Sequence, residues 1–69
     1  MDFAIIKEGR LIELIEAKHS DENISKHLLY YAKRLKPEKA TQVVAKIKRP
    51  YDKGRIKVVD PITYFRNQI

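Results

Sequence analysis

Three ionisable side chains near the start of the chain, Asp2, Glu16 and Lys18, are of types that can do chemistry together. Two carboxylates can hold Mg²⁺ or Mn²⁺ against the oxygens of a phosphate group. A lysine beside such an ion can orient or deprotonate an attacking water. The pattern therefore predicts metal-dependent hydrolysis of a phosphodiester. Because so short a pattern also arises by chance, the alternative is that these residues are solvated strand ends or a plain ion pair.

Two apolar segments on either side of Gly9 would position these groups. Both are rich in Ile and Leu and lack helical spacing, so we predict two strands that reverse at Gly9. Side chains alternate along a strand, so one face of the second strand should carry Ile12, Leu14, Glu16 and Lys18, and the other Leu11, Glu13, Ile15 and Ala17. Glu16 and Lys18 are therefore expected to project from the same face.

The place of Asp2 depends on the length of the turn, because a slip of one residue moves a side chain to the other face of a sheet. A two-residue loop at residues 8–9 would separate Asp2 from Glu16. A three-residue loop at residues 7–9 would place Asp2 opposite Leu14 and diagonal to Glu16. We predict the three-residue loop, which brings the two carboxylates together.

A crossover helix and a parallel strand are predicted next. The polar residues 19–23 supply N-cap candidates, so the helix should begin there, and Pro37 should end it. Apolar side chains recur at three- and four-residue spacing on one face of this helix, at Ile24, Leu28, Tyr31, Ala32 and Leu35. A β-branched run within residues 39–47 is predicted as a strand parallel to the one that carries Glu16, because such crossovers join parallel strands.

The last third of the chain is predicted to form a basic loop, an edge strand and a short closing helix. Residues 46–55 combine basic side chains with proline and glycine and should be the loop. Residues 56–59 should be the strand at the sheet edge. Asp60 and the proline after it are typical of a helix start, so residues 62–67 should form a helix that packs through two apolar side chains, Ile62 and Phe65.

The basic loop offers the best candidates for contacts with the phosphates of a nucleic acid. They are Lys48, Arg49, Lys53 and Arg55, joined by Lys26 on the outer side of the helix. Tyr51 within the loop could stack on a base. The alternative is a solvated loop that Tyr51 attaches to the core.

Composition limits the class of protein. Sixty-nine residues make one small domain, residues 1–69, with a thin core. A net charge of +6 and a pI near 9.7 favour polyanionic partners such as DNA, although a charge-rich surface of this kind is also typical of heat-stable, thermophilic proteins. The chain has no cysteine, no signal-peptide pattern and no apolar run long enough for a membrane span, so we expect a cytoplasmic protein.

Four segments of the chain resemble the restriction-endonuclease-like PD-(D/E)XK superfamily: residues 2–6, 14–20, 25–31 and 36–44. The likeness is closest to the nuclease-like C-terminal domain of archaeal ATPases. It implies an α/β (α+β) fold, with a truncated core in the order β-β-α-β-β-α and a mixed sheet with one crossover helix. The usual N-terminal helix and strand would be missing.

The resemblance also implies roles for individual residues. Asp2 and Glu16 match the metal-binding carboxylates, Ala17 would lend its backbone carbonyl to the metal, and Lys18 matches the lysine of the motif. Mg²⁺ or Mn²⁺ would be the cofactor, and an ATPase would be a possible partner.

Two functions are compatible with these features. The first is metal-dependent hydrolysis of DNA at Asp2, Glu16 and Lys18. The second is a non-catalytic nuclease-like module, a remnant that binds nucleic acid or a partner protein. Because the missing N-terminal elements would leave a sheet edge open, the second function carries the linked prediction of a homodimer through that edge.

Overall fold

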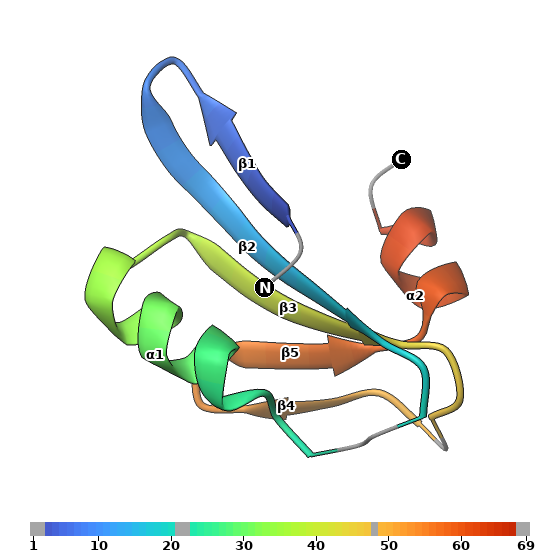
Figure 1. Cartoon of the computed structure of the whole chain (residues 1–69). Coiled ribbons are helices and arrows are strands. Elements are labelled where there is room, and N and C mark those ends of the chain that lie inside the picture. Colours follow the sequence, from blue (N-terminus) through green and yellow to red (C-terminus); the bar gives the residue numbers. More distant parts are fainter. Residues whose placement is uncertain (1–2, 21–22, 48, 68–69) are drawn as a thin grey trace.

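The computed structural model describes residues 3–20, 23–47 and 49–67 and contains one mixed sheet with two helices (Figure 1). The sheet has five strands in the order β1-β2-β3-β5-β4. The elements follow one another along the chain as β1 (Phe3–Lys7), β2 (Arg10–Lys18), α1 (Lys26–Leu35), β3 (Lys39–Val44), β4 (Tyr51–Lys53), β5 (Ile56–Val59) and α2 (Pro61–Arg66). The predicted α+β class with a mixed sheet and one crossover helix is therefore confirmed.

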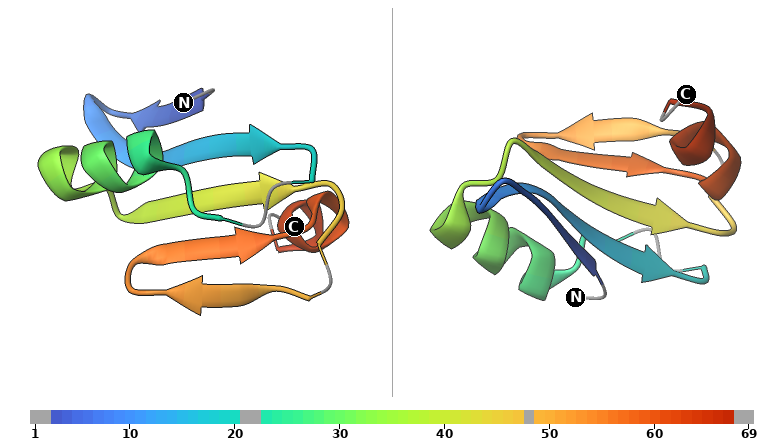
Figure 2. Two further views of the ribbon diagram at one scale, coloured as in Figure 1. Left: turned by 60° about the horizontal axis from the view of Figure 1, so that its bottom comes forward. Right: turned by 90° about the horizontal axis from the view of Figure 1, so that it is seen from above.

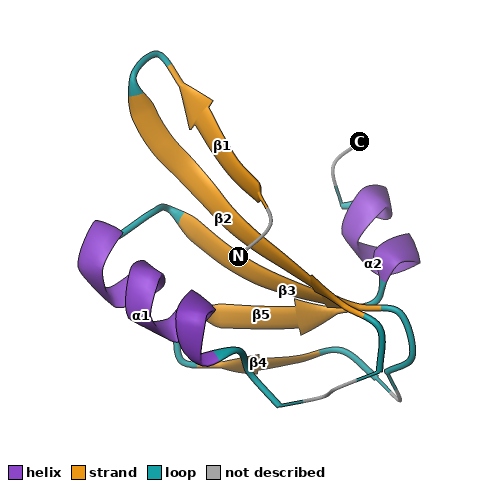
Figure 3. Ribbon diagram, viewed as in Figure 1, coloured by secondary structure: helices purple, strands orange, loops and turns teal. Residues whose placement is uncertain are grey.

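The β2–α1–β3 unit is the centre of the fold. β2 and β3 are parallel, as predicted, and α1 crosses between them on one face of the sheet (Figure 3). The helix contributes two buried apolar side chains, Leu28 and Ala32, to a core built mainly from the sheet. The sheet side of this core consists of Leu14, Ala40, Val44, Ile56 and Val58. Each large apolar side chain buried here stabilises the fold by about 1.5–3 kcal/mol.

The turn between β1 and β2 differs from the prediction. Its loop has two residues, Glu8 and Gly9, both with positive φ (54° and 77°), and not three. The register then shifts at a β-bulge between Ile5 and Ile6, after which Ala4 pairs with Leu14. A bulge adds one residue to one strand and so changes which face the following side chains occupy. Asp2 lies outside the described residues, so its predicted position stays a prediction.

The predicted basic loop contains a strand. β4 pairs antiparallel with β5 inside the segment predicted to be irregular. The element order is therefore β-β-α-β-β-β-α, and the predicted order β-β-α-β-β-α is wrong by one strand. β5 lies between β3 and β4, so it is an interior strand and not the predicted edge. The two edges are β1 and β4.

Helix α1 begins later than predicted, and fewer of its apolar side chains are buried than predicted. Its N-cap is Ser25, not a residue of the 19–23 stretch, and it ends at Leu35, ahead of Pro37, through a left-handed Lys36 (φ 49°). Of the five apolar residues predicted to face the core, Leu28 and Ala32 are buried and Ile24 packs at the margin. Tyr31 and Leu35 are exposed.

Helix α2 lies on the opposite face of the sheet from α1 (Figure 2). Its start is as predicted: the Asp60 carboxylate accepts a hydrogen bond from the Thr63 N–H at 3.1 Å, and Pro61 takes the first helical position. The prediction that Ile62 and Phe65 pack is wrong, because these side chains are 68% and 65% exposed. Ile62 and Phe65 are three positions apart and so share one side of the helix. The helix turns a different side to the sheet, where the Tyr64 hydroxyl contacts Glu13 of β2.

Candidate functional site

Glu16 and Lys18 meet near the C-terminal end of β2. Their side chains project from the same face of the strand, as the spacing predicted, and form an ion pair of 3.6 Å between Lys18 Nζ and a Glu16 carboxylate oxygen. The Glu16 side chain is buried, with 7% of its surface exposed, whereas the Lys18 side chain is 31% exposed. The lysine is therefore the member of the pair that is more accessible to solvent.

The carboxylate of Glu16 is held in its ionised form. Burial alone would raise its pKa, but hydrogen bonding with the Ser25 side chain and positive charge that includes Lys18 outweigh burial, and the pKa of Glu16 lies below its usual value. Ser25 is also the N-cap of α1, where its Oγ accepts the Leu28 N–H at 3.3 Å. One hydroxyl group therefore joins the start of the helix to the candidate site.

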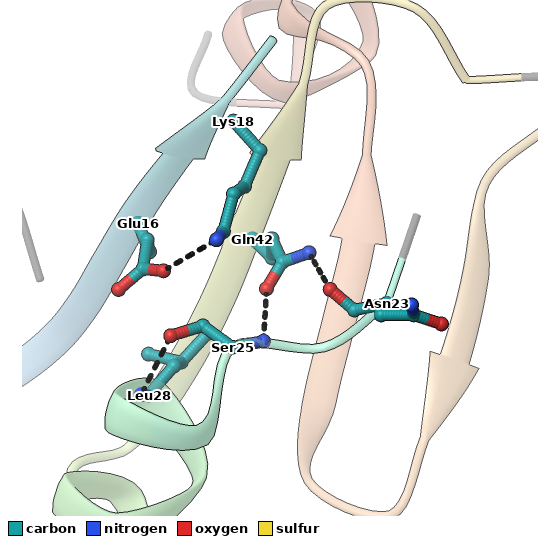
Figure 4. A network of polar contacts seen from close by, with 6 residues as sticks. All are labelled: Glu16, Lys18, Asn23, Ser25, Leu28 and Gln42. Atoms are coloured by element: carbon teal, nitrogen blue, oxygen red, sulfur yellow. Dashed lines mark hydrogen bonds and ion pairs between the residues drawn. The ribbon is translucent and has the colours of Figure 1, made fainter. Parts of the chain in front are cut away.

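Gln42 fixes Ser25 in place. It is fully buried on β3, directly across from Glu16 in the parallel register. Its Oε1 accepts the Ser25 N–H at 2.8 Å, and its Nε2 donates to the Asn23 carbonyl at 2.8 Å (Figure 4). Both polar ends of a carboxamide that has no contact with water are thus bonded, as burial requires. Residues 23–25 are tied by this side chain to the strand beside Glu16.

The role of Gln42 in holding Ser25 was not predicted from the sequence. Gln42 lies between Thr41 and two valines in a run predicted to be a strand. A fully polar amide at the centre of a buried strand is costly unless it is bonded, and that was the available signal. The identity of its partners could not be inferred from the sequence, because it depends on the register between β2 and β3.

Of the predicted metal ligands, Glu16 and Ala17 lie within the described residues and Asp2 does not. Glu16 fits a hard divalent cation, because its carboxylate is ionised and offers oxygen donors. Ala17, whose carbonyl was predicted to join it, follows in β2 and pairs in register with Val43 of β3. Asp2 lies outside the described residues. Within residues 3–20, 23–47 and 49–67, no group of three or more His, Cys, Asp or Glu side chains is arranged to hold a metal ion.

The predicted phosphate-contact residues are spread over several elements. Lys26 is exposed in the first turn of α1, and Arg49 is exposed before β4. Lys53, at the end of β4, and Arg55, in the following turn, are exposed and line one groove together. Lys48 lies outside the described residues. Tyr51 is 38% exposed and belongs to β4, so it is part of the sheet rather than of a loop.

A second buried carboxylate, Glu13, lies on the opposite face of the sheet, beside α2. It is 3% exposed and accepts hydrogen bonds from the Thr41 hydroxyl at 2.7 Å and from the Tyr64 hydroxyl at 3.2 Å. Burial, followed by the charge of Glu13 and this hydrogen bond, raises the pKa of Tyr64. A tyrosine with a raised pKa keeps its proton and remains the donor, so these contacts attach α2 to the sheet.

Comparison of the chain with protein-family models, with curated proteins and with solved structures found no match. None of the helices among the described residues has the length and apolar character needed to cross a bilayer.

Proposed function

We propose that this chain is a PD-(D/E)XK nuclease-like domain that hydrolyses phosphodiester bonds in DNA in a metal-dependent reaction. The observation that supports the proposal is the ionised, buried Glu16 carboxylate with the Lys18 ammonium 3.6 Å away near the end of β2. The surrounding arrangement also supports it, because a hairpin strand, a crossover helix and a parallel strand hold this pair. The restriction-endonuclease-like character of the core is part of the proposal.

Each residue has a role in this proposal. Asp2, Glu16 and the Ala17 carbonyl would hold Mg²⁺ or Mn²⁺, which when bound supplies positive charge to the scissile phosphate and to the attacking water. Lys18 orients that water and neutralises charge on the phosphate oxygens, since its ammonium is next to Glu16 and reaches solvent. Ser25 and Gln42 are positioning residues, because they act by holding the Glu16 carboxylate.

A cleavage assay tests this proposal. Supercoiled plasmid is incubated with the protein and Mg²⁺ or Mn²⁺, and nicked and linear products are measured. We expect Glu16→Gln and Lys18→Ala to abolish cleavage, because each removes one half of the pair. Glu38→Gln is the matched control, since it neutralises a carboxylate that forms a surface ion pair with Arg10. A wild-type protein that leaves the plasmid intact, or a Glu16→Gln protein that still cuts it, would refute the proposal.

A second candidate function is a non-catalytic module that binds nucleic acid or a protein such as an ATPase. The observation that favours it is the edge strand β1, whose apolar side chains Phe3, Ile5 and Ile6 are 59%, 40% and 65% exposed. An exposed apolar edge favours pairing with another strand, and the simplest such partner is a second copy of the chain.

Analytical ultracentrifugation tests the homodimer. The wild-type protein is expected to sediment as a dimer at high concentration, and Ile6→Lys is expected to shift it to monomer by placing a charge on the edge. A strict monomer for the wild-type protein would remove the homodimer from consideration.

A further inference from the structure

A groove of about 490 Å³ runs between α1 and the β4–β5 turn. Its floor is apolar and consists of Leu29, Ala32 and Ile56. It lies at the C-terminal end of α1, whereas Ser25 and Glu16 lie at the N-terminal end. A helix of ten residues is about 15 Å long, so the groove is separate from the candidate site. Its volume is within the range that binds small molecules or a segment of a larger ligand.

Both walls of this groove carry cations. Lys33 and Lys36 come from α1 and its C-cap, and Lys53 and Arg55 come from the β4–β5 hairpin. All four residues are exposed, and none forms an ion pair with another residue of the described ranges. No acidic side chain lines the groove. Four positive charges therefore surround an apolar floor that no acidic side chain lines.

A cavity on the other face of the sheet provides the contrast. It has a volume of about 260 Å³, and its cations are Lys39, Lys57 and Arg55, the last of which it shares with the groove. Two carboxylates, Glu13 and Glu38, also line this cavity. The cations of that cavity thus have negative charge within the same walls. No carboxylate lines the groove beside α1, and its cations Lys33, Lys36 and Lys53 do not line the other cavity, so the groove is the better match for an anionic ligand.

We propose that the groove binds a single-stranded segment of nucleic acid. The phosphates lie against the cations of the two walls, and a base lies on the floor formed by Leu29, Ala32 and Ile56. Single-strand binding usually combines a positively charged groove that follows the backbone with aromatic side chains on which the bases stack. In this groove the apolar floor takes the place of the aromatic surface. The inference deepens the second candidate function, because it names the surface and the class of nucleic acid that it binds. It does not depend on the proposed hydrolysis, because these residues are remote from Glu16 and need no metal.

Two double variants with the same change in net charge test the proposal. Lys33→Gln with Lys53→Gln removes one cation from each wall of the groove. Lys39→Gln with Lys57→Gln removes two cations from the opposite face. Binding of a fluorescent single-stranded oligothymidylate is measured by anisotropy in EDTA over a series of salt concentrations, so metal-dependent cleavage cannot contribute.

We expect the groove variant to bind about tenfold more weakly than wild type and the control variant to stay within about twofold. The slope of log K against log salt should become shallower by about 1.4 in the groove variant, because each single-strand phosphate contact contributes roughly 0.7. Equal losses in the two double variants would mean that net charge alone drives binding, and this result would overturn the proposal.

Two further ligands test the role of the floor and the class of partner. An abasic oligonucleotide of the same length should bind more weakly than oligothymidylate, since it has no base to place on the floor. Equal affinity for the two would overturn the placement of a base there. A polyglutamate peptide that binds wild type as tightly as the oligonucleotide, with the same loss in the groove variant, would assign the groove to an acidic protein and overturn the proposal.

Discussion

Replacing Gln42 by Met is the most informative change to the fold around the candidate site. The substitution keeps the length of the side chain and its burial but removes the acceptor for the Ser25 N–H and the donor to the Asn23 carbonyl, both at 2.8 Å. Ser25 is 7% exposed, so its N–H is left buried without an acceptor, which costs about 1–3 kcal/mol. Asn23 is exposed and its carbonyl can turn to water, so that hydrogen bond is worth about 1 kcal/mol.

Together these losses amount to about 2–4 kcal/mol. A domain of this length has a free energy of unfolding of roughly 3–10 kcal/mol, so the variant should be strongly destabilised but measurable. The melting temperature of so small a domain should fall by about 8–32 °C, since each kcal/mol shifts it by about 4–8 °C. Urea unfolding followed by far-UV circular dichroism measures the change, with Lys57→Met as a control that places the same residue at an exposed strand position.

The same variant links stability to the candidate site. Releasing Ser25 removes a hydrogen-bond partner of Glu16, so the pKa of Glu16 should rise toward its usual value, as an NMR titration of the carboxylate would detect. A loss of less than about 0.5 kcal/mol relative to wild type, with the pKa of Glu16 unchanged, would show that the Gln42 carboxamide does not hold this loop.

Three further predictions concern single residues. The pKa of Glu16 is lower in the folded chain than in the unfolded chain, so the stability that its charge contributes is present above the unfolded pKa and is lost as the pH falls through the folded pKa. In acid unfolding, the free energies of unfolding of wild type and Glu16→Gln should therefore differ above the folded pKa and become equal below it. Tyr64→Phe removes the 3.2 Å hydrogen bond to buried Glu13 and should lower the free energy of unfolding by about 1 kcal/mol in urea, whereas no change would mean that the contact is not made in solution. Glu8→Asn should raise the melting temperature and increase the free energy of unfolding by about 1 kcal/mol, because Glu8 has φ 54° before Gly9 and Asn-Gly is the preferred pair for such a turn. A destabilised variant would contradict the two-residue loop.

The parts of the fold that the sequence predicted are those governed by local alternation and capping. The second half of β2 is regular, so the period of two placed Glu16 and Lys18 on the same face correctly. Asp60 followed by Pro61 predicted the start of α2, because both the cap and the fixed φ of proline act within one turn. The parallel pairing of β2 and β3 followed from the length of the crossover helix.

The parts that were not predicted depend on long-range pairing or on backbone conformations that the local sequence does not favour. A two-residue turn requires a positive φ at Glu8, which glutamate adopts rarely, so a longer loop was the natural prediction. β4 has only three residues, of which Asp52 and Lys53 are charged, and it is a strand because β5 lies beside it. The bond between Gln42 and Ser25 joins residues 17 positions apart and needed the register of β3.

The central claim, that Glu16 is part of a metal-dependent site, is tested most directly by titrating ¹⁵N-labelled protein with Mn²⁺. We expect the amide signals of Glu16 and Ala17 to broaden first, at millimolar metal or below, and Glu16→Gln to abolish this selective broadening. If these two signals stay sharp, or if Glu38 and other surface carboxylates broaden equally with them, the claim is contradicted.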